Sequence, residues 1–143
     1  MIAKRRKAML PSGRTNKKTF SDQEERGLTA PFKTMEFLDY QTESRRTAIY
    51  PDAGNNMAYP VLGLCGEAGE VAEKVKKVMR DKGGYFDHES RAAIKKELGD
   101  VLWYVAQIAS ELNFDMNEVA QSNLDKLHDR MKRGKIKGDG DNR

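Results

Sequence analysis

The stretch that decides the fold is residues 88–112, HESRAAIKKELGDVLWYVAQIASEL. Its apolar side chains recur every three or four residues, which places them along one face of an α-helix. Asn113 follows directly, and asparagine is a residue type that often ends a helix. The segment therefore predicts one long amphipathic helix. Its apolar stripe consists of Ile94, Leu98, Val101, Leu102, Val105, Ile108, Ala109 and Leu112.

The chain before this helix predicts a second one of similar length. Apolar residues with the same spacing indicate a helix from about Met57 or Pro60 to Asp81. The pair Gly83-Gly84 then ends it, because glycine readily leaves the helical conformation. The short connection between the two helices favours antiparallel packing.

Two further helices flank this pair. Thr34 can cap a helix that fades near Ile49, ahead of a turn-rich loop. Asp115 and Glu118 resemble a capping box for a helix that reaches about Arg133. No segment alternates as a strand would, so the sequence predicts an all-α fold, a four-helix bundle. A thin bundle of this size often buries its remaining apolar face by forming a dimer.

Charge is distributed unevenly along the chain. Residues 1–33 carry nine basic and three acidic side chains without sustained periodicity, so we expect a flexible basic N-terminal arm before a domain at residues 34–143. Residues 34–129 carry a net charge of −6, and residues 130–143 one of +4. An acidic middle between basic ends fits a carboxylate site that holds cations and meets an anionic substrate.

Cysteine content and hydropathy bear on the compartment. With a single cysteine the chain forms no internal disulfide, and we expect Cys65 to be a small buried side chain in a reducing compartment. The N-terminus lacks the apolar stretch of a signal peptide, and no segment approaches a membrane span. We therefore expect a soluble cytoplasmic protein that does not bind membranes.

Two pairs of acidic residues lie beside the apolar stripes. Glu67 and Glu70 are three residues apart on the second predicted helix, and Glu97 and Asp100 are three apart on the third. Residues at this spacing share a helix face, so antiparallel packing would bring the pairs together. Converging carboxylates repel one another, and Mg²⁺ removes that repulsion while it binds phosphates. The pattern indicates hydrolysis of a phosphate ester or anhydride, whereas one isolated acidic pair is usually only a solvated face.

Gly63, Gly66 and Gly69 recur around the first acidic pair. Each lowers helix propensity by about 1 kcal/mol relative to alanine. Three such residues in one helix indicate close approach of another helix or room for a ligand.

Two stretches resemble the MazG family of all-α nucleoside triphosphate pyrophosphohydrolases: GLCGEAGEVAE at residues 63–73 and KELGDVLWYV at residues 96–105. That family carries a Glu-x-x-Glu motif, a variable spacer and a Glu-x-x-Asp motif, and the spacer here is residues 71–96. The tail KIKGDGDNR, residues 135–143, resembles the short single-domain members of bacteria and phages. The resemblance covers about residues 35–143 and leaves out the arm.

The resemblance implies cleavage between the α and β phosphates of a ribo- or deoxyribonucleoside triphosphate, which releases a nucleoside monophosphate and pyrophosphate. This reaction would serve nucleotide-pool control or house-cleaning. Glu67, Glu70, Glu97 and Asp100 would be the Mg²⁺ ligands, with Mn²⁺ a substitute. One of them, or a metal-bound hydroxide, would serve as base for the attacking water. The resemblance also implies a homodimer or homotetramer, located in the host cytoplasm if the gene belongs to a phage.

The resemblance further supplies residues that would contact the nucleotide. Asn123 and Lys126 match a family Asn-x-x-Lys pattern that meets phosphates, and Tyr104 matches a family position near the substrate. Gln41 could read the base and Trp103 could stack on it, although simple packing is the commoner role of a tryptophan beside a core stripe. The expected nucleotide contacts are Asn123, Lys126, Arg130, Tyr104, Gln41 and Trp103.

A second class of function is compatible with the same sequence: a helical adaptor that binds nucleic acid or protein through its basic arm. The lysine run Lys74, Lys76 and Lys77 reads as a solvated face in either case. The sequence argues against a di-iron carboxylate bundle, because such a bundle needs Glu-x-x-His pairs and neither His88 nor His128 follows a glutamate by three positions.

Overall fold

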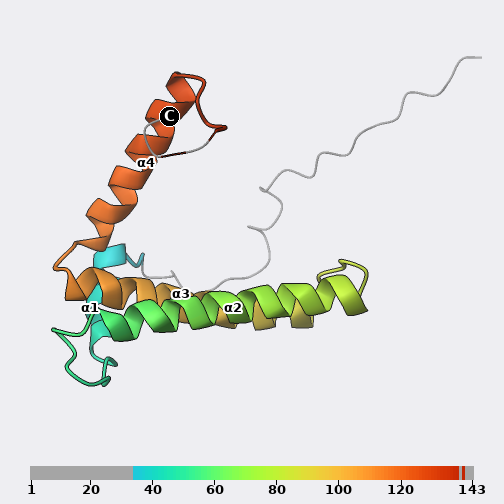
Figure 1. The fold of residues 1–143 in the computed structure, drawn as a ribbon, viewed down its shortest axis with the longest axis horizontal. Helices are drawn as coiled ribbons and strands as arrows, with labels where there is room; N and C mark the ends of the chain where they lie inside the picture. The colour runs from blue at the N-terminus through green and yellow to red at the C-terminus, as the bar shows by residue number, and fades with distance from the viewer. Residues whose placement is uncertain (1–33, 139, 141–143) are drawn as a thin grey trace, which may run out of the picture. The chain divides into compact units, whose positions relative to one another are not determined.

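A computed structural model describes residues 34–138 and 140, so the expected arm at residues 1–33 lies outside the described part. The described residues form four helices and contain no strand, which confirms the expected all-α class. None of these helices is long and apolar enough to cross a membrane. The helices are α1 Phe37–Arg45, α2 Ala58–Asp81, α3 His88–Glu111 and α4 Met116–Lys132 (Figure 1).

Helices α2 and α3 lie side by side and run in opposite directions (Figure 1). The turn between them uses Gly83 and Gly84 at φ values of 56° and 83°, a left-handed conformation that glycine adopts without strain. Asp87 then caps α3, because its side chain accepts a hydrogen bond from the N–H of Ser90 at 2.9 Å. This hairpin brings the acidic motifs of the two helices together.

The buried side chain of Gln41 joins α1 to the end of α3 and the start of α4. Its amide nitrogen donates to the Ser110 hydroxyl at 3.2 Å and to the Phe114 carbonyl at 2.9 Å. Its amide oxygen accepts from the N–H of Met116 at 3.0 Å. The adjoining core consists of Ala106, Ala109 and Met116, with Tyr40, Leu102 and Val105 packed against it.

Glu111, in the last turn of α3, anchors the loop between α1 and α2. Its side chain is 2% exposed and pairs with Arg45 at 2.9 Å. It also accepts hydrogen bonds from the Tyr50 hydroxyl at 2.5 Å and from the N–H groups of Gly54 and Asn56 at 2.8 and 2.9 Å. Burial alone would raise the pKa of this carboxyl, but the hydrogen bonds outweigh burial and lower it to about 2.

Two local expectations about α1 and α2 are wrong. Glu36, not Thr34, caps α1, and it forms a reciprocal capping box with Asp39. Cys65 is exposed, not buried, because α2 turns the neighbouring positions Leu64 and Glu67 into the half-buried interface with α3.

The three glycines of α2 differ in their surroundings. A Cβ at Gly63 would lie 2.2 Å from Cε1 of Tyr104, so this glycine lets the Tyr104 ring pack directly on the backbone of α2. A Cβ at Gly66 or Gly69 would meet nothing within 4 Å. Close packing against α3 therefore explains why glycine stands at position 63. Within this chain it does not explain the glycines at positions 66 and 69.

Helix α4 begins at an Asp115 cap, whose side chain accepts from the N–H of Asn117 at 2.7 Å. The helix packs on α1. Its apolar stripe stays largely exposed, with Leu124 at 47% and Met131 at 60% exposure. This face of α4 is therefore not covered by the described part of one chain.

Candidate metal centre

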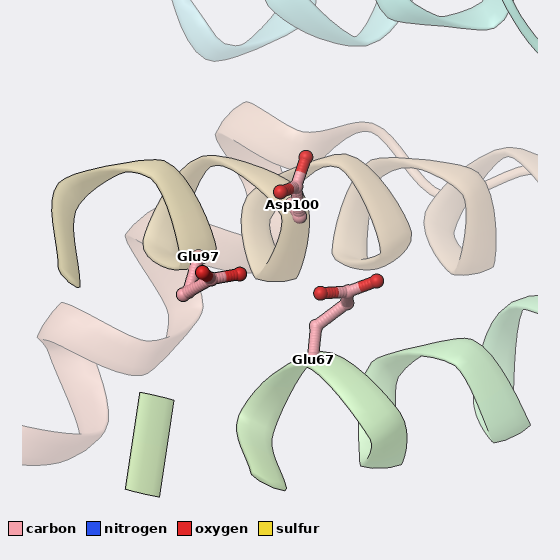
Figure 2. Close-up of side chains that lie close together, drawn as sticks. All are labelled: Glu67, Glu97 and Asp100. Atoms are coloured by element: carbon pink, nitrogen blue, oxygen red, sulfur yellow. The ribbon is translucent and has the colours of Figure 1, made fainter. Parts of the chain in front are cut away.

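Three carboxylates from facing helices form what we call the carboxylate cluster: Glu67 of α2 with Glu97 and Asp100 of α3 (Figure 2). One oxygen of each lies within 4.8 Å of an oxygen of the other two. Glu97 and Asp100 are three residues apart and share a side of α3, and Glu67 points from α2 across to α3 (Figure 2). Glu67 and Glu97 are half-buried, whereas Asp100 is exposed.

Glu70, the fourth expected ligand, lies outside this group of three. It is exposed, one helical turn after Glu67. Its negative charge still reaches the cluster, because it is one of the carboxylates that raise the pKa of Glu67. The structure thus brings three of the four expected ligands together, and a ligand role for Glu70 stays a prediction.

The cluster is electrostatically unfavourable by itself. Burial is the main cause that raises the pKa of Glu67, and the charges of Asp100, Glu70 and Glu97 raise it further. Three carboxylate oxygens are hard donors, which suit Mg²⁺ or Mn²⁺ better than metals that prefer sulfur or imidazole ligands. The chemistry of the donor set therefore fits the expected metal.

Four side chains form an aromatic group: Tyr50, Tyr59, Trp103 and Tyr104. Tyr50 stacks on Tyr59 with ring centroids 4.8 Å apart and meets the edge of Trp103 at 6.3 Å. Trp103 in turn meets Tyr104 edge-on at 4.9 Å. Burial raises the pKa of Tyr104, and the charges of Tyr59, Glu67 and Asp100 add to this effect. Tyr104 is thus the aromatic side chain that adjoins the carboxylate cluster.

Trp103 and Gln41 are held by hydrogen bonds within the chain. The indole N–H of Trp103 donates to the Thr47 hydroxyl at 2.8 Å, so this tryptophan joins α3 to the loop that follows α1. The amide of Gln41 makes the three bonds that join α1 to α3 and α4. Both residues position other elements in this conformation, and their contact with a nucleotide stays a prediction.

The remaining expected contacts lie on α4. Asn123 and Lys126 are exposed, and Arg130 is buried and donates to the carbonyl oxygen of Gly140 at 3.4 Å. Because α4 packs on α1, the structure does not bring these three side chains to the carboxylate cluster of the same chain. Their contact with phosphates stays a prediction.

Comparison with known proteins bears directly on this site. A family model described as the MazG nucleotide pyrophosphohydrolase domain matches residues 58–134. This chain belongs to that family. Gene 37 protein of Mycobacterium phage L5 is 50% identical over 109 residues, which is 73% of this chain and 96% of that protein. No solved structure matched.

The matched MazG segment begins at the first residue of α2 and includes all of α3 and α4. Both acidic motifs therefore lie inside the MazG domain, and α1 precedes it. Sequence reasoning missed two residues outside the motifs. Glu111 anchors the loop between α1 and α2, and Tyr59 stacks on Tyr50 in the aromatic group. Neither gave a signal, because a buried glutamate at a helix end and a tyrosine after a loop look like ordinary surface residues in a sequence.

Proposed function

We propose that this MazG-family protein uses Mg²⁺ to hydrolyse ribo- or deoxyribonucleoside triphosphates to a nucleoside monophosphate and pyrophosphate. The observation that supports this most is the convergence of Glu67, Glu97 and Asp100 from facing helices within the family segment. Carboxylates that repel one another favour a bound cation, and Mg²⁺ also binds phosphates. The description of the family, nucleotide pyrophosphohydrolase, agrees with that chemistry.

Each acidic residue then has a role. Glu67, Glu97 and Asp100 would hold Mg²⁺, with Mn²⁺ as a substitute. Mg²⁺ held there would neutralise the polyphosphate and orient water. The water oxygen attacks the α phosphorus, the bond to the oxygen that bridges the α and β phosphates breaks, and pyrophosphate leaves with the electron pair. One of the four carboxylates would accept the proton of the attacking water, and Glu70, exposed beside the cluster, would either do so or complete the ligands.

The proposal extends to the nucleotide contacts that the sequence predicts. The nucleoside would lie near Tyr104, with Trp103 and Gln41 supporting that end of the site. Asn123, Lys126 and Arg130 would meet the phosphates. Because α4 packs on α1, these contacts require either movement of α4 or a neighbouring chain in a homodimer or homotetramer.

The biological setting that fits best is nucleotide-pool control in a cytoplasm. The relative from Mycobacterium phage L5 supports a phage gene that acts in the cytoplasm of its host. The adaptor function depends on residues 1–33, and nothing in residues 34–138 favours it.

A panel of nucleotides with product identification tests the proposal. We expect Mg²⁺-dependent formation of a monophosphate and pyrophosphate, resolved by chromatography. In ¹⁸O-labelled water the label should enter the monophosphate, because the water attacks the α phosphorus. Absence of turnover with every canonical or modified nucleotide would sink the proposal, and so would a diphosphate with orthophosphate as products.

A further inference from the structure

Lys74 differs from the other lysines of its run. It lies seven residues after Glu67 on α2, so it shares the side of the helix that faces α3. Its ammonium nitrogen lies 3.3 Å from Oε1 of Glu97, and the two side chains are 33% and 14% exposed. Lys76, by contrast, is exposed, and Lys77 pairs with Glu73 of its own helix at 3.1 Å.

This ion pair conflicts with a metal at the carboxylate cluster. Lys74 neutralises the carboxylate of Glu97, which a divalent cation would also use, and two positive charges a few ångströms apart repel. The ammonium is carried on a flexible four-carbon stem, so Lys74 can release Glu97 without movement of α2. Metal binding should therefore free Lys74 for another negative group.

A place where a negative group of a ligand could bind adjoins Lys74. A hollow of about 230 Å³ lies between the end of α2 and the start of α3, and its lining includes Lys74, Lys77 and Lys82 as well as the carboxylates of Asp81 and Glu89. Lys77 and Lys82 are paired with Glu73 and Asp87, whereas Lys74 lines the hollow and pairs with Glu97 of the cluster. The carboxylates of Asp81 and Glu89 offset part of the lysine charge, so the group there that suits phosphate is Lys74, which a metal at Glu97 would release.

The opposite end of the cluster is aromatic. Tyr104 packs on Gly63, one helical turn before Glu67, and Lys74 lies two turns after Glu67. Along α2 the site thus runs from an aromatic end through the carboxylates to a basic end. A nucleoside triphosphate has the same order of chemistry: a base, then phosphates of increasing distance from it.

We infer that Lys74 changes partner during the reaction: it neutralises Glu97 in the metal-free protein and contacts the outer phosphates of a metal-bound nucleotide. The inference rests on the proposed function and adds the orientation in which the nucleotide binds. The nucleoside lies toward Tyr104, and the pyrophosphate leaves toward the hollow at Lys74. An ammonium group placed there stabilises the negative charge that pyrophosphate gains as the bond breaks.

Binding measurements on the full-length protein test both parts of the inference, the competition with the metal and the contact with phosphates. Lys74→Met removes the charge and keeps the stem, and Lys76→Met is the matched control at an exposed position of the same helix. Without nucleotide, Lys74→Met should bind Mn²⁺ about tenfold more tightly in electron paramagnetic resonance titrations, because a competing positive charge is gone. At saturating Mg²⁺ it should bind inorganic tripolyphosphate about tenfold more weakly in calorimetry, because one charge-assisted contact is lost. Lys76→Met should change neither affinity, and Lys74→Arg should stay near the wild type in both.

Each outcome decides one half of the inference. Unchanged or weaker Mn²⁺ binding in Lys74→Met overturns the competition for Glu97, and unchanged tripolyphosphate binding overturns the phosphate contact. If the wild type hydrolyses no nucleotide, the proposed function fails separately, and the Mn²⁺ titration still decides whether Lys74 competes with the metal. Circular dichroism checks the fold, and Lys74→Gln replaces Lys74→Met in both titrations if the latter loses helix.

Discussion

At the scale of single residues, repulsion between the carboxylates of the cluster raises the pKa of Glu67. Its pKa is raised above 4.5, first by burial and then by three neighbouring carboxylates. A carboxyl with a raised folded pKa binds its proton more tightly in the folded state. The stability that protonated Glu67 contributes is therefore fully present below about pH 4.5 and is lost as the pH rises through the raised pKa.

Glu67→Gln separates this stability effect from catalysis. The variant should raise the Tm of the metal-free protein at pH 7, because one negative charge leaves the cluster. It should also lower turnover at least about a hundredfold, because a metal ligand is lost. Calorimetry and a pyrophosphate-release assay measure the two effects. Glu73→Gln, on the same helix outside the cluster, should keep full turnover, and a Glu67→Gln protein with normal turnover would refute the metal site.

Glu111→Gln tests the anchor of the loop. The pKa of Glu111 is lowered to about 2, so its carboxylate stabilises the fold above the unfolded pKa near 4.5 and loses this effect as the pH falls toward 2. Loss of the buried charge should cost about 3 kcal/mol of unfolding free energy at pH 7 in urea titrations. The difference from the wild type should shrink as the pH falls toward 2. Glu43→Gln, which breaks an exposed ion pair with Arg46, should cost less than about 1 kcal/mol.

At the scale of helices, alanine substitutions at two glycines of α2 should change the free energy of unfolding in opposite directions. Gly63→Ala would force a Cβ against the Tyr104 ring, and such overpacking should lower the unfolding free energy by about 1–3 kcal/mol. Gly66→Ala meets open space, so it should raise that free energy by up to about 1 kcal/mol through helix propensity. Urea titrations of the two variants give the comparison. Changes of the same sign in both would contradict the packing described for Gly63.

Much of the helical layout could be predicted because its signals are local. The expected ends at Asp81 and His88 are those observed, since periodicity and the glycine turn act within a few residues. The facing of the acidic motifs also follows from helix phase and a short connection. These features need no knowledge of distant contacts.

The errors arise where distant parts of the chain decide the outcome. Cys65 is exposed because the rotation of α2 about its own axis depends on packing against α3. Glu111 accepts hydrogen bonds from a loop that ends more than fifty positions earlier in the chain. No rule of sequence spacing connects this glutamate with that loop. Helix phase gives the face on which a side chain lies, but not which neighbours it meets there.

At the scale of the whole molecule, the described residues bury few apolar side chains. The buried hydrophobic residues are Tyr50, Val78, Ala106, Ala109 and Met116. Large apolar side chains on three helices stay exposed instead, among them Leu62 at 71%, Met79 at 60%, Leu98 at 52% and Met131 at 60%. Burial of such surface is worth about 25 cal/mol per Å², which favours self-association of the chain.

The expected homodimer or homotetramer can be measured directly. Sedimentation equilibrium should give two or four times the mass of the chain. Leu62→Glu should shift the population toward monomer if α2 lies in the interface, because a charge would then be buried there. Ile49→Glu is the control, since Ile49 is 94% exposed in the loop between α1 and α2. A wild type that sediments as a monomer at micromolar concentration would contradict the expectation.

An oligomer would also resolve the separation between α4 and the carboxylate cluster. If one chain supplies Glu67 and its neighbour supplies Lys126, a mixture of Glu67→Gln and Lys126→Ala chains contains mixed dimers with one intact site. Random reassociation at equal amounts should then restore about a quarter of wild-type pyrophosphate release, because half of the dimers are mixed and each has one intact site of two. Each variant assayed alone should stay inactive. A mixture as inactive as its components would place Lys126 at the site of its own chain, and α4 would then have to move to reach the phosphates.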